Sequence, residues 1–314
     1  MRRASLLVLF IAIVAALAPA TAFAQGPNPF GQGNSPFAPL SSQVIYDSTI
    51  TPLPPHHVSQ AFQANQVSEV GDEVTFAGSA RTLDMVTVSM DSYACESEGI
   101  WNSPNCTTTP GDTFSVPITL HIYNVGAGDT LGSEIATMTD TFDIPYRPSA
   151  STDECNEGNS SVGYWYDSGT DTCWAGMAHN IMFDFSGQGV QLPDTAIWSV
   201  SFNTSTYGET PLGTQACSSQ PQGCPYDALN LDLNPNVVVG SKPNPDTLWH
   251  NSATAGQYCD NGTAGTGSFR LDSPTSACWE GYVPAAQFTA TSDFFSWAWS
   301  WWQDNFPFIF HNFN

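Results

Sequence analysis

Short segments in which apolar and polar residues alternate recur along the middle of this chain, and they constrain its fold more than any other feature. Each segment is rich in β-branched or aromatic residues and is bounded by Gly, Pro, Asn or Ser, which is typical of strands. They span residues 73–76, 83–90, 118–123, 135–139, 181–185, 196–202, 229–233 and 283–290. The region shows no helical stripe, so we expect an all-β protein, a jelly-roll-like antiparallel β-sandwich with disulfide-stapled loops.

The sequence divides into four parts. Residues 1–24 resemble a signal peptide, because an apolar run follows Arg2 and Arg3, and Ala22-Phe23-Ala24 fits the small-x-small cleavage rule. Residues 25–42 form a Pro/Gly/Asn-rich spacer. Residues 43–290 carry the strand-like segments and all eight cysteines, so we predict that they form the β-sandwich domain. Residues 291–314 form an aromatic-rich C-terminal tail.

The chain is strongly acidic, with 29 Asp and Glu against 6 Lys and Arg. Two of those basic residues would leave with the signal peptide. Because phosphate recognition requires clustered Lys and Arg, the charge excludes nucleic acid as a partner. Charged residues make up only 11% of the chain, so Ser, Thr, Asn, Gln and Gly must supply much of the surface. We expect a secreted protein, extracellular or at the cell surface.

The eight cysteines indicate an oxidising compartment. Sequence alone does not determine their connectivity, but each successive pair brackets a loop-like stretch between strand candidates. We therefore expect nearest-neighbour disulfides. The predicted bonds are Cys95–Cys106, Cys155–Cys173, Cys217–Cys224 and Cys259–Cys278. Closing loops this short stabilises a fold by roughly 2–4 kcal/mol each. A zinc site is disfavoured because the chain has no C-x-x-C pair.

Familiar catalytic and metal motifs are absent. The chain contains neither G-x-S-x-G nor H-E-x-x-H. His56 and His57 are adjacent on a Pro-flanked segment, so their side chains should diverge on a solvated loop. Residues 230–234 begin like a calcium-binding loop, but Pro235 and Ser241 replace the required Gly and Glu. The alternating leucines instead predict a strand with a polar outer face.

Aromatic residues near the cysteines are the best candidates for ligand contact. Trp101 lies inside the first predicted cysteine loop, Tyr164, Trp165 and Tyr166 lie inside the second, and Trp174 follows it. Flat rings on stapled loops can stack on sugar faces, while neighbouring polar groups bind hydroxyls. The competing interpretation is that these rings only pack the loops onto the sandwich.

These observations favour a secreted, non-catalytic extracellular or cell-surface protein with a carbohydrate-binding or adhesive function. One alternative is a glycan-active hydrolase that uses an unfamiliar pair of carboxylates. A structural, self-assembling surface subunit is another. We assign no catalytic residue.

Calcium is the one cofactor that the composition suggests. Asp153, Glu154, Glu157, Asp167 and Asp171 cluster around the second cysteine loop, and oxygen-rich loops bind Ca²⁺. The opposing interpretation is that the acids only keep a Lys-poor surface soluble. We expect at most a structural Ca²⁺, at a position that the sequence does not define.

Several segments resemble a group of secreted bacterial β-sandwich proteins that are attached to cell surfaces through interchangeable, or choice-of-anchor, C-terminal elements. The similar stretches are residues 74–90 (VTFAGSARTLDMVTVSM), 122–125, 144–150, 202–205 and 267–272. The resemblance implies the fold and an extracellular setting, and it implies no functional residues. The C-terminal tail lacks the Arg-rich end of the usual bacterial sorting signals.

The tail at residues 291–314 combines many aromatic residues with no Lys or Arg. As a strand, it would place Trp297, Trp299 and Trp301 on one face. As a helix, it would begin at Ser292 and end before Pro307, which the capping signals favour. Polar residues interrupt it too often for a transmembrane span. We expect docking or self-association, with packing onto the domain or contact with a membrane interface as alternatives. The predicted docking residues are Trp297, Trp299, Trp301 and Trp302.

Overall fold

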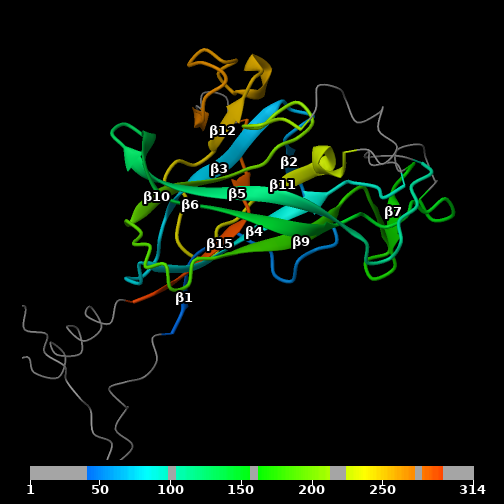
Figure 1. Cartoon of the computed structure of the whole chain (residues 1–314), viewed down its shortest axis with the longest axis horizontal. Coiled ribbons are helices and arrows are strands. Elements are labelled where there is room, and N and C mark those ends of the chain that lie inside the picture. The colour runs from blue at the N-terminus through cyan, green and yellow to red at the C-terminus, as the bar shows by residue number, and fades with distance from the viewer. Residues whose placement is uncertain (1–40, 98–103, 156–161, 213–223, 273–277, 293–314) are drawn as a thin grey trace, which may run out of the picture. The chain divides into compact units, whose positions relative to one another are not determined.

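The fold of the chain is all-β (Figure 1). The computed structural model describes residues 41–97, 104–155, 162–212, 224–272 and 278–292. Within these ranges every strand pair is antiparallel, and the only helical elements are the 3₁₀ turns η2 (Pro225–Ala228) and η3 (Ala255–Gln257). The predicted fold class is therefore confirmed.

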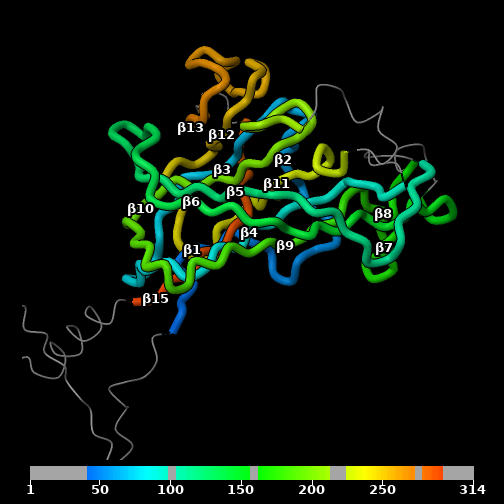
Figure 2. Tube along the Cα trace, in the orientation of Figure 1, coloured from blue at the N-terminus to red at the C-terminus, as the bar shows by residue number. Residues whose placement is uncertain are grey.

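The larger sheet has seven strands, in the order β1-β15-β4-β11-β14, with β2 paired to β11 and β9 paired to β4. Its strands are β1 (Gln43–Asp47), β2 (Ser59–Ala61), β4 (Thr82–Ser92), β9 (Met177–Asp184), β11 (Leu229–Asn234), β14 (Val283–Pro284) and β15 (Ala286–Thr291). The first and last described strands, β1 and β15, lie side by side (Figure 2).

The second sheet has six strands, in the order β13-β12-β3-β10-β5-β6. Its strands are β3 (Val67–Thr75), β5 (Thr113–Gly126), β6 (Thr130–Pro145), β10 (Thr195–Ser201), β12 (Leu248–Ser252) and β13 (Arg270–Asp272). A small separate hairpin joins β7 (Trp165–Asp167) to β8 (Thr172–Trp174) at one end of the sheets, at the right of Figure 2.

The two large sheets pack face to face around one cluster of buried apolar side chains. Alternate residues of each strand point inward, as sheet geometry requires. Ring contacts join the layers: Phe142 of β6 lies 4.9 Å from Phe183 of β9, and Trp198 of β10 lies 6.1 Å from Phe288 of β15. This arrangement is a β-sandwich whose outward strand positions are left for polar residues.

Disulfides close three of the predicted loops. The bonds Cys95–Cys106, Cys155–Cys173 and Cys259–Cys278 are formed, with Cα atoms 5.8, 5.7 and 5.9 Å apart. Cys224 is also disulfide-bonded, and its predicted partner Cys217 lies outside the described residues. The nearest-neighbour expectation thus holds for the three pairs that can be compared.

Most predicted strands form, and the differences have local causes. The alternating segments at 83–90, 118–123 and 196–202 become β4, β5 and β10. The segment at 283–290 is interrupted at Ala285, because β14 pairs with β11 whereas β15 pairs with β4 and β1. The predicted signal peptide and all of the predicted spacer except Ser41 and Ser42 lie outside the described residues.

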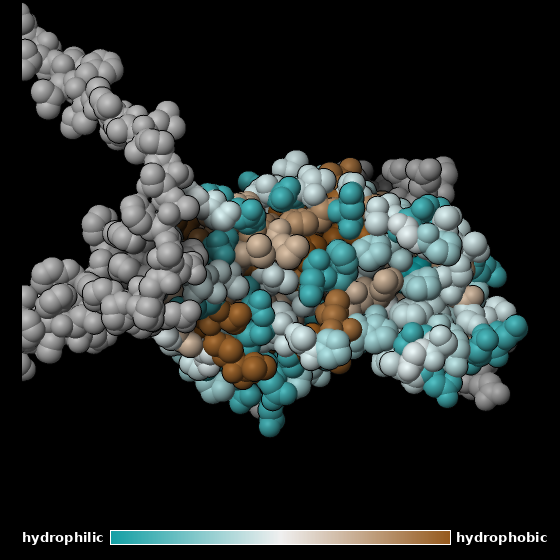
Figure 3. Space-filling model, turned by 90° about the horizontal axis from the view of Figure 1, so that it is seen from below, coloured by the Kyte–Doolittle hydropathy of each residue, from teal (hydrophilic) through white to brown (hydrophobic). Residues whose placement is uncertain are grey.

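On the face of the described part that Figure 3 shows, most residues are polar, and apolar residues interrupt them in separate groups. The large apolar residues that are most exposed in the described ranges include Val58, Met182, Leu212 and Val238. In the described part of the chain, no helix has the length and apolar character needed to cross a membrane.

Candidate ligand-binding site

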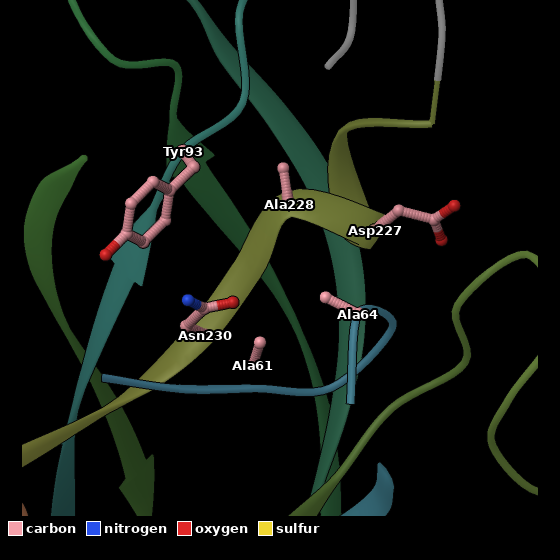
Figure 4. Close-up of a pocket in the computed structure, with 6 residues that line it drawn as sticks. All are labelled: Ala61, Ala64, Tyr93, Asp227, Ala228 and Asn230. Carbon is pink, nitrogen blue, oxygen red and sulfur yellow. The ribbon is translucent and has the colours of Figure 1, made fainter. Parts of the chain in front are cut away.

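A pocket of about 230 Å³ lies where β2, β11 and the end of β4 meet (Figure 4). Three alanines line it together with one aromatic and two polar side chains. The lining residues are Ala61, Ala64, Tyr93, Asp227, Ala228 and Asn230. Tyr93 and Asn230 lie on one side and Ala64 on the other. Since alanine methyl groups fill little volume, the small residues leave this space open between the strands.

Strand pairing fixes the walls of the pocket. Asn230 of β11 stands opposite Ala61 of β2 on one side and Asp91 of β4 on the other. The Tyr93 N–H donates to the carbonyl oxygen of Ala228 at 2.8 Å, which extends the pairing of β4 and β11 beyond Ser92. Strand pairing therefore places Ala61, Asn230 and Asp91 side by side, although they are far apart in the sequence.

The polar groups at the pocket are ordered by hydrogen bonds. Asn230 Nδ2 donates to Ser59 Oγ at 3.0 Å, and the same Ser59 oxygen lies 3.3 Å from the Tyr93 hydroxyl. Burial raises the pKa of Tyr93, so its phenol stays protonated. The Tyr93 ring and the Asn230 amide thus have fixed orientations at the edge of the pocket.

Asp227 has a mainly structural role. Its carboxylate points away from Asn230 (Figure 4) and accepts hydrogen bonds from the backbone N–H and the hydroxyl of Ser205, each at 2.7 Å. Burial raises the pKa of Asp227, and these two hydrogen bonds oppose the shift. These hydrogen bonds hold η2, which includes Ala228, against the segment that follows β10.

A His–Asp contact adjoins the pocket. His56 Nδ1 lies 2.5 Å from Oδ2 of the fully buried Asp91, and the backbone N–H of His57 donates to the same oxygen at 3.0 Å. The His56 side chain is only 17% exposed, so the expected solvated loop is wrong for this residue. Its imidazole packs edge-on against the ring of Tyr93, with centroids 5.4 Å apart.

Asp232 is a second buried acid on the same face of the seven-stranded sheet. It lies two residues after Asn230 on β11 and is 2% exposed. Burial, together with the negative charge of Asp91, raises the pKa of Asp232 well above its usual value. The Asp232 carboxyl therefore binds a proton more readily than an ordinary aspartate. The predicted strand at 230–234 is confirmed, but its polar face is buried.

The predicted aromatic residues of the second cysteine loop lie near this site and not in it. Trp165 is buried, and its Nε1 donates to the carbonyl oxygen of Gly176 at 2.7 Å, so it packs the hairpin onto the sandwich. Tyr166 donates to Asp171 at 2.6 Å, and the Tyr164 carbonyl accepts the Ser151 N–H. None of these three residues lines the pocket.

Trp174 provides the link between that hairpin and the pocket. Its ring lies 5.5 Å from His56, whose other neighbour is Tyr93. Trp101 and the tail residues Trp297, Trp299, Trp301 and Trp302 lie outside the described residues, so their predicted roles stay predictions.

Metal ligands are sparse in the described ranges. Only Cys259, Asp272 and Cys278 bring three potential ligand atoms within reach of one ion, and the two cysteines are consumed by their disulfide. Of the acids near the second cysteine loop, Asp167 accepts hydrogen bonds from Gly169 and Thr170, which closes a turn. The described residues therefore provide no position for the predicted structural Ca²⁺.

Sequence reasoning missed Asp91, and it placed His56 on a solvated loop and Asp232 on a solvent-facing strand surface. Asp232 occupies an outward position of a predicted strand, where a polar side chain is expected to face water, and Asp91 directly follows the predicted strand at 83–90. A Pro-rich segment covers them instead: the Pro55 carbonyl accepts the Ala178 N–H at 2.9 Å, and the Val58 carbonyl accepts the Leu233 N–H at 2.8 Å. The prolines before His56 were the available signal for a rigid covering segment.

Comparison with known proteins provides no relative for this chain: no family model, no curated protein and no solved structure matches it. The fold and the pocket define it as a disulfide-stapled β-sandwich with a small, partly aromatic pocket on the seven-stranded sheet.

Proposed function

We propose that this chain is a secreted extracellular or cell-surface protein that binds one sugar residue of a glycan in the pocket formed by β2, β4 and β11, and that this site binds without catalysis. The observation that carries the proposal is the joint presence of the Tyr93 ring and the ordered Asn230 amide around an alanine-lined space. A sugar offers an apolar ring face to an aromatic side chain and hydroxyl groups to an amide.

The size and charge of the pocket favour a small neutral ligand. Its volume of about 230 Å³ is below the roughly 300–1,000 Å³ of sites for drug-sized molecules. Its described lining residues include no Lys or Arg, and Asp91 stands opposite Asn230 on the neighbouring strand, so an anionic ligand would meet only negative charge. A hydroxyl-rich neutral sugar satisfies both conditions.

The extracellular setting has separate support. Disulfides form and persist in oxidising compartments, and the described residues contain three of them: Cys95–Cys106, Cys155–Cys173 and Cys259–Cys278. The predicted signal peptide and the resemblance to surface-anchored bacterial sandwich proteins favour secretion. Self-association through residues 291–314 remains a prediction of the sequence.

A glycan array tests the proposal, with a variant that fills the pocket. Ala64 is exposed at the pocket wall, so Ala64→Trp should block the space without disturbing the core. Ala127→Trp is the matched control, because Ala127 is exposed in the turn between β5 and β6. We expect retention of the wild type and of Ala127→Trp on the same glycans and at least a tenfold loss for Ala64→Trp. Equal retention of all three proteins, or of none, would contradict the proposal.

A further inference from the structure

A second group of polar side chains occupies the outer face of the six-stranded sheet, on strands that do not line the pocket. His121 of β5 stands opposite Ser199 of β10, and Ser201 follows two positions further along β10. Glu134 of β6 stands opposite Tyr123 of β5. Since outward and inward positions alternate, these residues share one face, while Leu120, Ile122 and Val200 are buried in the core.

His121 is held between a hydroxyl and a carboxylate. Its Nε2 lies 3.3 Å from Ser201 Oγ, and its Nδ1 lies 2.9 Å from Glu134 Oε1. Thr137 Oγ1 also approaches Nδ1, at 3.3 Å. The imidazole stacks on Tyr123 at an interplanar angle of 12°, which fixes the plane of the ring. The His121 side chain is 23% exposed, so a substrate in solvent can reach this group.

The order hydroxyl, imidazole, carboxylate is that of an activated serine nucleophile with its base and orienting acid. When Glu134 accepts the Nδ1–H, the Nε2 lone pair faces Ser201 Oγ. We propose that Ser201, His121 and Glu134 form a nucleophile, base and positioning carboxylate that hydrolyse carboxylic esters at the outer face of the six-stranded sheet. This activity would be additional to sugar binding, and it uses none of the residues of the pocket.

The proposed hydrolysis balances with the ester and water as its only reactants. Ser201 Oγ attacks the ester carbonyl carbon while its proton passes to His121 Nε2. The bond between the carbonyl carbon and the alkoxy oxygen then breaks, and the alcohol leaves with that proton. Water attacks the resulting acyl-serine, its proton passes to Nε2, and the carboxylic acid departs as Ser201 regains its proton. Glu134 stabilises the imidazolium that forms in each half of the reaction.

The neighbours of Ser201 favour an ester with a short acyl group. Glu69 of β3 stands directly opposite Ser201, and its Oε1 accepts the Ser199 hydroxyl at 2.6 Å. Burial raises the pKa of Glu69, and its hydrogen bond from Ser199 opposes that shift. Tyr123 and Phe269, 6.0 Å apart, add an aromatic flank. An acetyl ester presented by an extended chain suits a reactive group that lies on a sheet face.

The test uses the full chain, 4-nitrophenyl acetate as substrate and a fluorophosphonate probe as serine label. We expect the probe to label Ser201, as mapped by peptide mass spectrometry, and Ser201→Ala and His121→Phe to lose at least tenfold in kcat. Ser115→Ala is the matched control, because Ser115 is exposed on β5 and donates to a carboxylate, Asp143 at 2.6 Å. It should retain the wild-type rate.

Glu134 is tested separately because it acts through His121. Glu134→Gln should lower kcat and leave KM unchanged. A purely structural role for Glu134 would not produce an effect on kcat alone. The proposal is overturned if the folded wild type is not labelled at Ser201, or if Ser201→Ala hydrolyses the ester at the wild-type rate. Neither result would bear on glycan retention by the pocket, so the two proposals fail independently.

Discussion

The rings of Trp174 and His56 lie 5.5 Å apart, and this contact joins the second disulfide-closed loop to the pocket beside Tyr93. His56 in turn contacts Asp91 and the Tyr93 ring. The order of the loop should therefore affect the position of Tyr93, although none of the loop's own aromatic residues lines the pocket. We therefore expect the second disulfide to affect the pocket as well as the stability of the fold.

Removing that disulfide should weaken both stability and sugar binding. For a double variant of Cys155→Ser and Cys173→Ser we expect a loss of roughly 3 kcal/mol in the free energy of unfolding. We also expect a several-fold higher Kd for the sugar, measured by calorimetric titration. Cys259→Ser with Cys278→Ser is the control, since its sequence separation of 19 matches the 18 of the second loop. It should lose similar stability and keep the wild-type Kd.

The ring of Tyr93 should matter more than its hydroxyl. Tyr93→Ala removes the aromatic wall and should raise the Kd about tenfold, which corresponds to about 1.4 kcal/mol. Tyr93→Phe keeps the ring and loses only the contact with Ser59, so its Kd should stay within about threefold of the wild type. Similar values for both variants would show that the ring does not contact the ligand.

Asp91 should be a major determinant of stability. Asp91→Ala leaves the His57 N–H without its acceptor and His56 without its carboxylate, so we expect the free energy of unfolding to fall by about 2–4 kcal/mol. Asp194→Ala is the control: Asp194 pairs with Arg81 at 2.9 Å, but its side chain is 90% exposed. That loss should stay below about 1 kcal/mol. Urea unfolding at neutral pH measures both.

His250 should give the protein an acid-sensitive stability. Burial, reinforced by the positive charge of Arg270 and opposed by Asp260, lowers the pKa of His250 from 6.5 to about 3. Its Nε2 is 3.7 Å from Asp272, and the rings of Tyr258 and Trp279 enclose it. Below pH 6.5 the unfolded chain binds a proton that the native state rejects, so stability falls as pH decreases towards 3.

The size of that effect can be measured against a variant without the imidazole. Between pH 6.5 and 4 the wild type should lose roughly 3 kcal/mol relative to His250→Gln. His57→Gln, which alters a less buried histidine, should retain the wild-type slope. Parallel stability curves for the wild type and His250→Gln over this range would show that His250 does not stay neutral in the native state.

The sequence predicted those parts of the fold that depend on local alternation. Residues 83–90 alternate because β4 has one face in the core, and nearest-neighbour cysteines pair because the loops between them are short. It did not predict β12 or β13. β12 is buried on both faces, so Leu248, Trp249 and His250 show no alternation, and β13 has only three residues.

The candidate site was less predictable, because its residues meet through non-local contacts. Asp91 and Asp232 come from strands that are far apart in the chain, and their burial depends on a third segment. Just before that segment the chain is held at Ser48, whose hydroxyl donates to the Pro284 carbonyl at 2.8 Å and whose carbonyl accepts from Asn234 at 2.7 Å. Periodicity identifies outward-facing polar residues but contains no information about what covers them.

The most direct test of sugar binding in the pocket is an NMR titration of protein labelled at its alanine methyl groups. Ala61, Ala64 and Ala228 line the pocket, whereas Ala127 and Ala253 lie elsewhere on the sandwich. With a glycan that the array retains, we expect the Ala61, Ala64 and Ala228 methyl signals to shift in a saturable manner while those of Ala127 and Ala253 stay in place. Saturable shifts confined to other alanines, with those three unchanged, would contradict the proposed site.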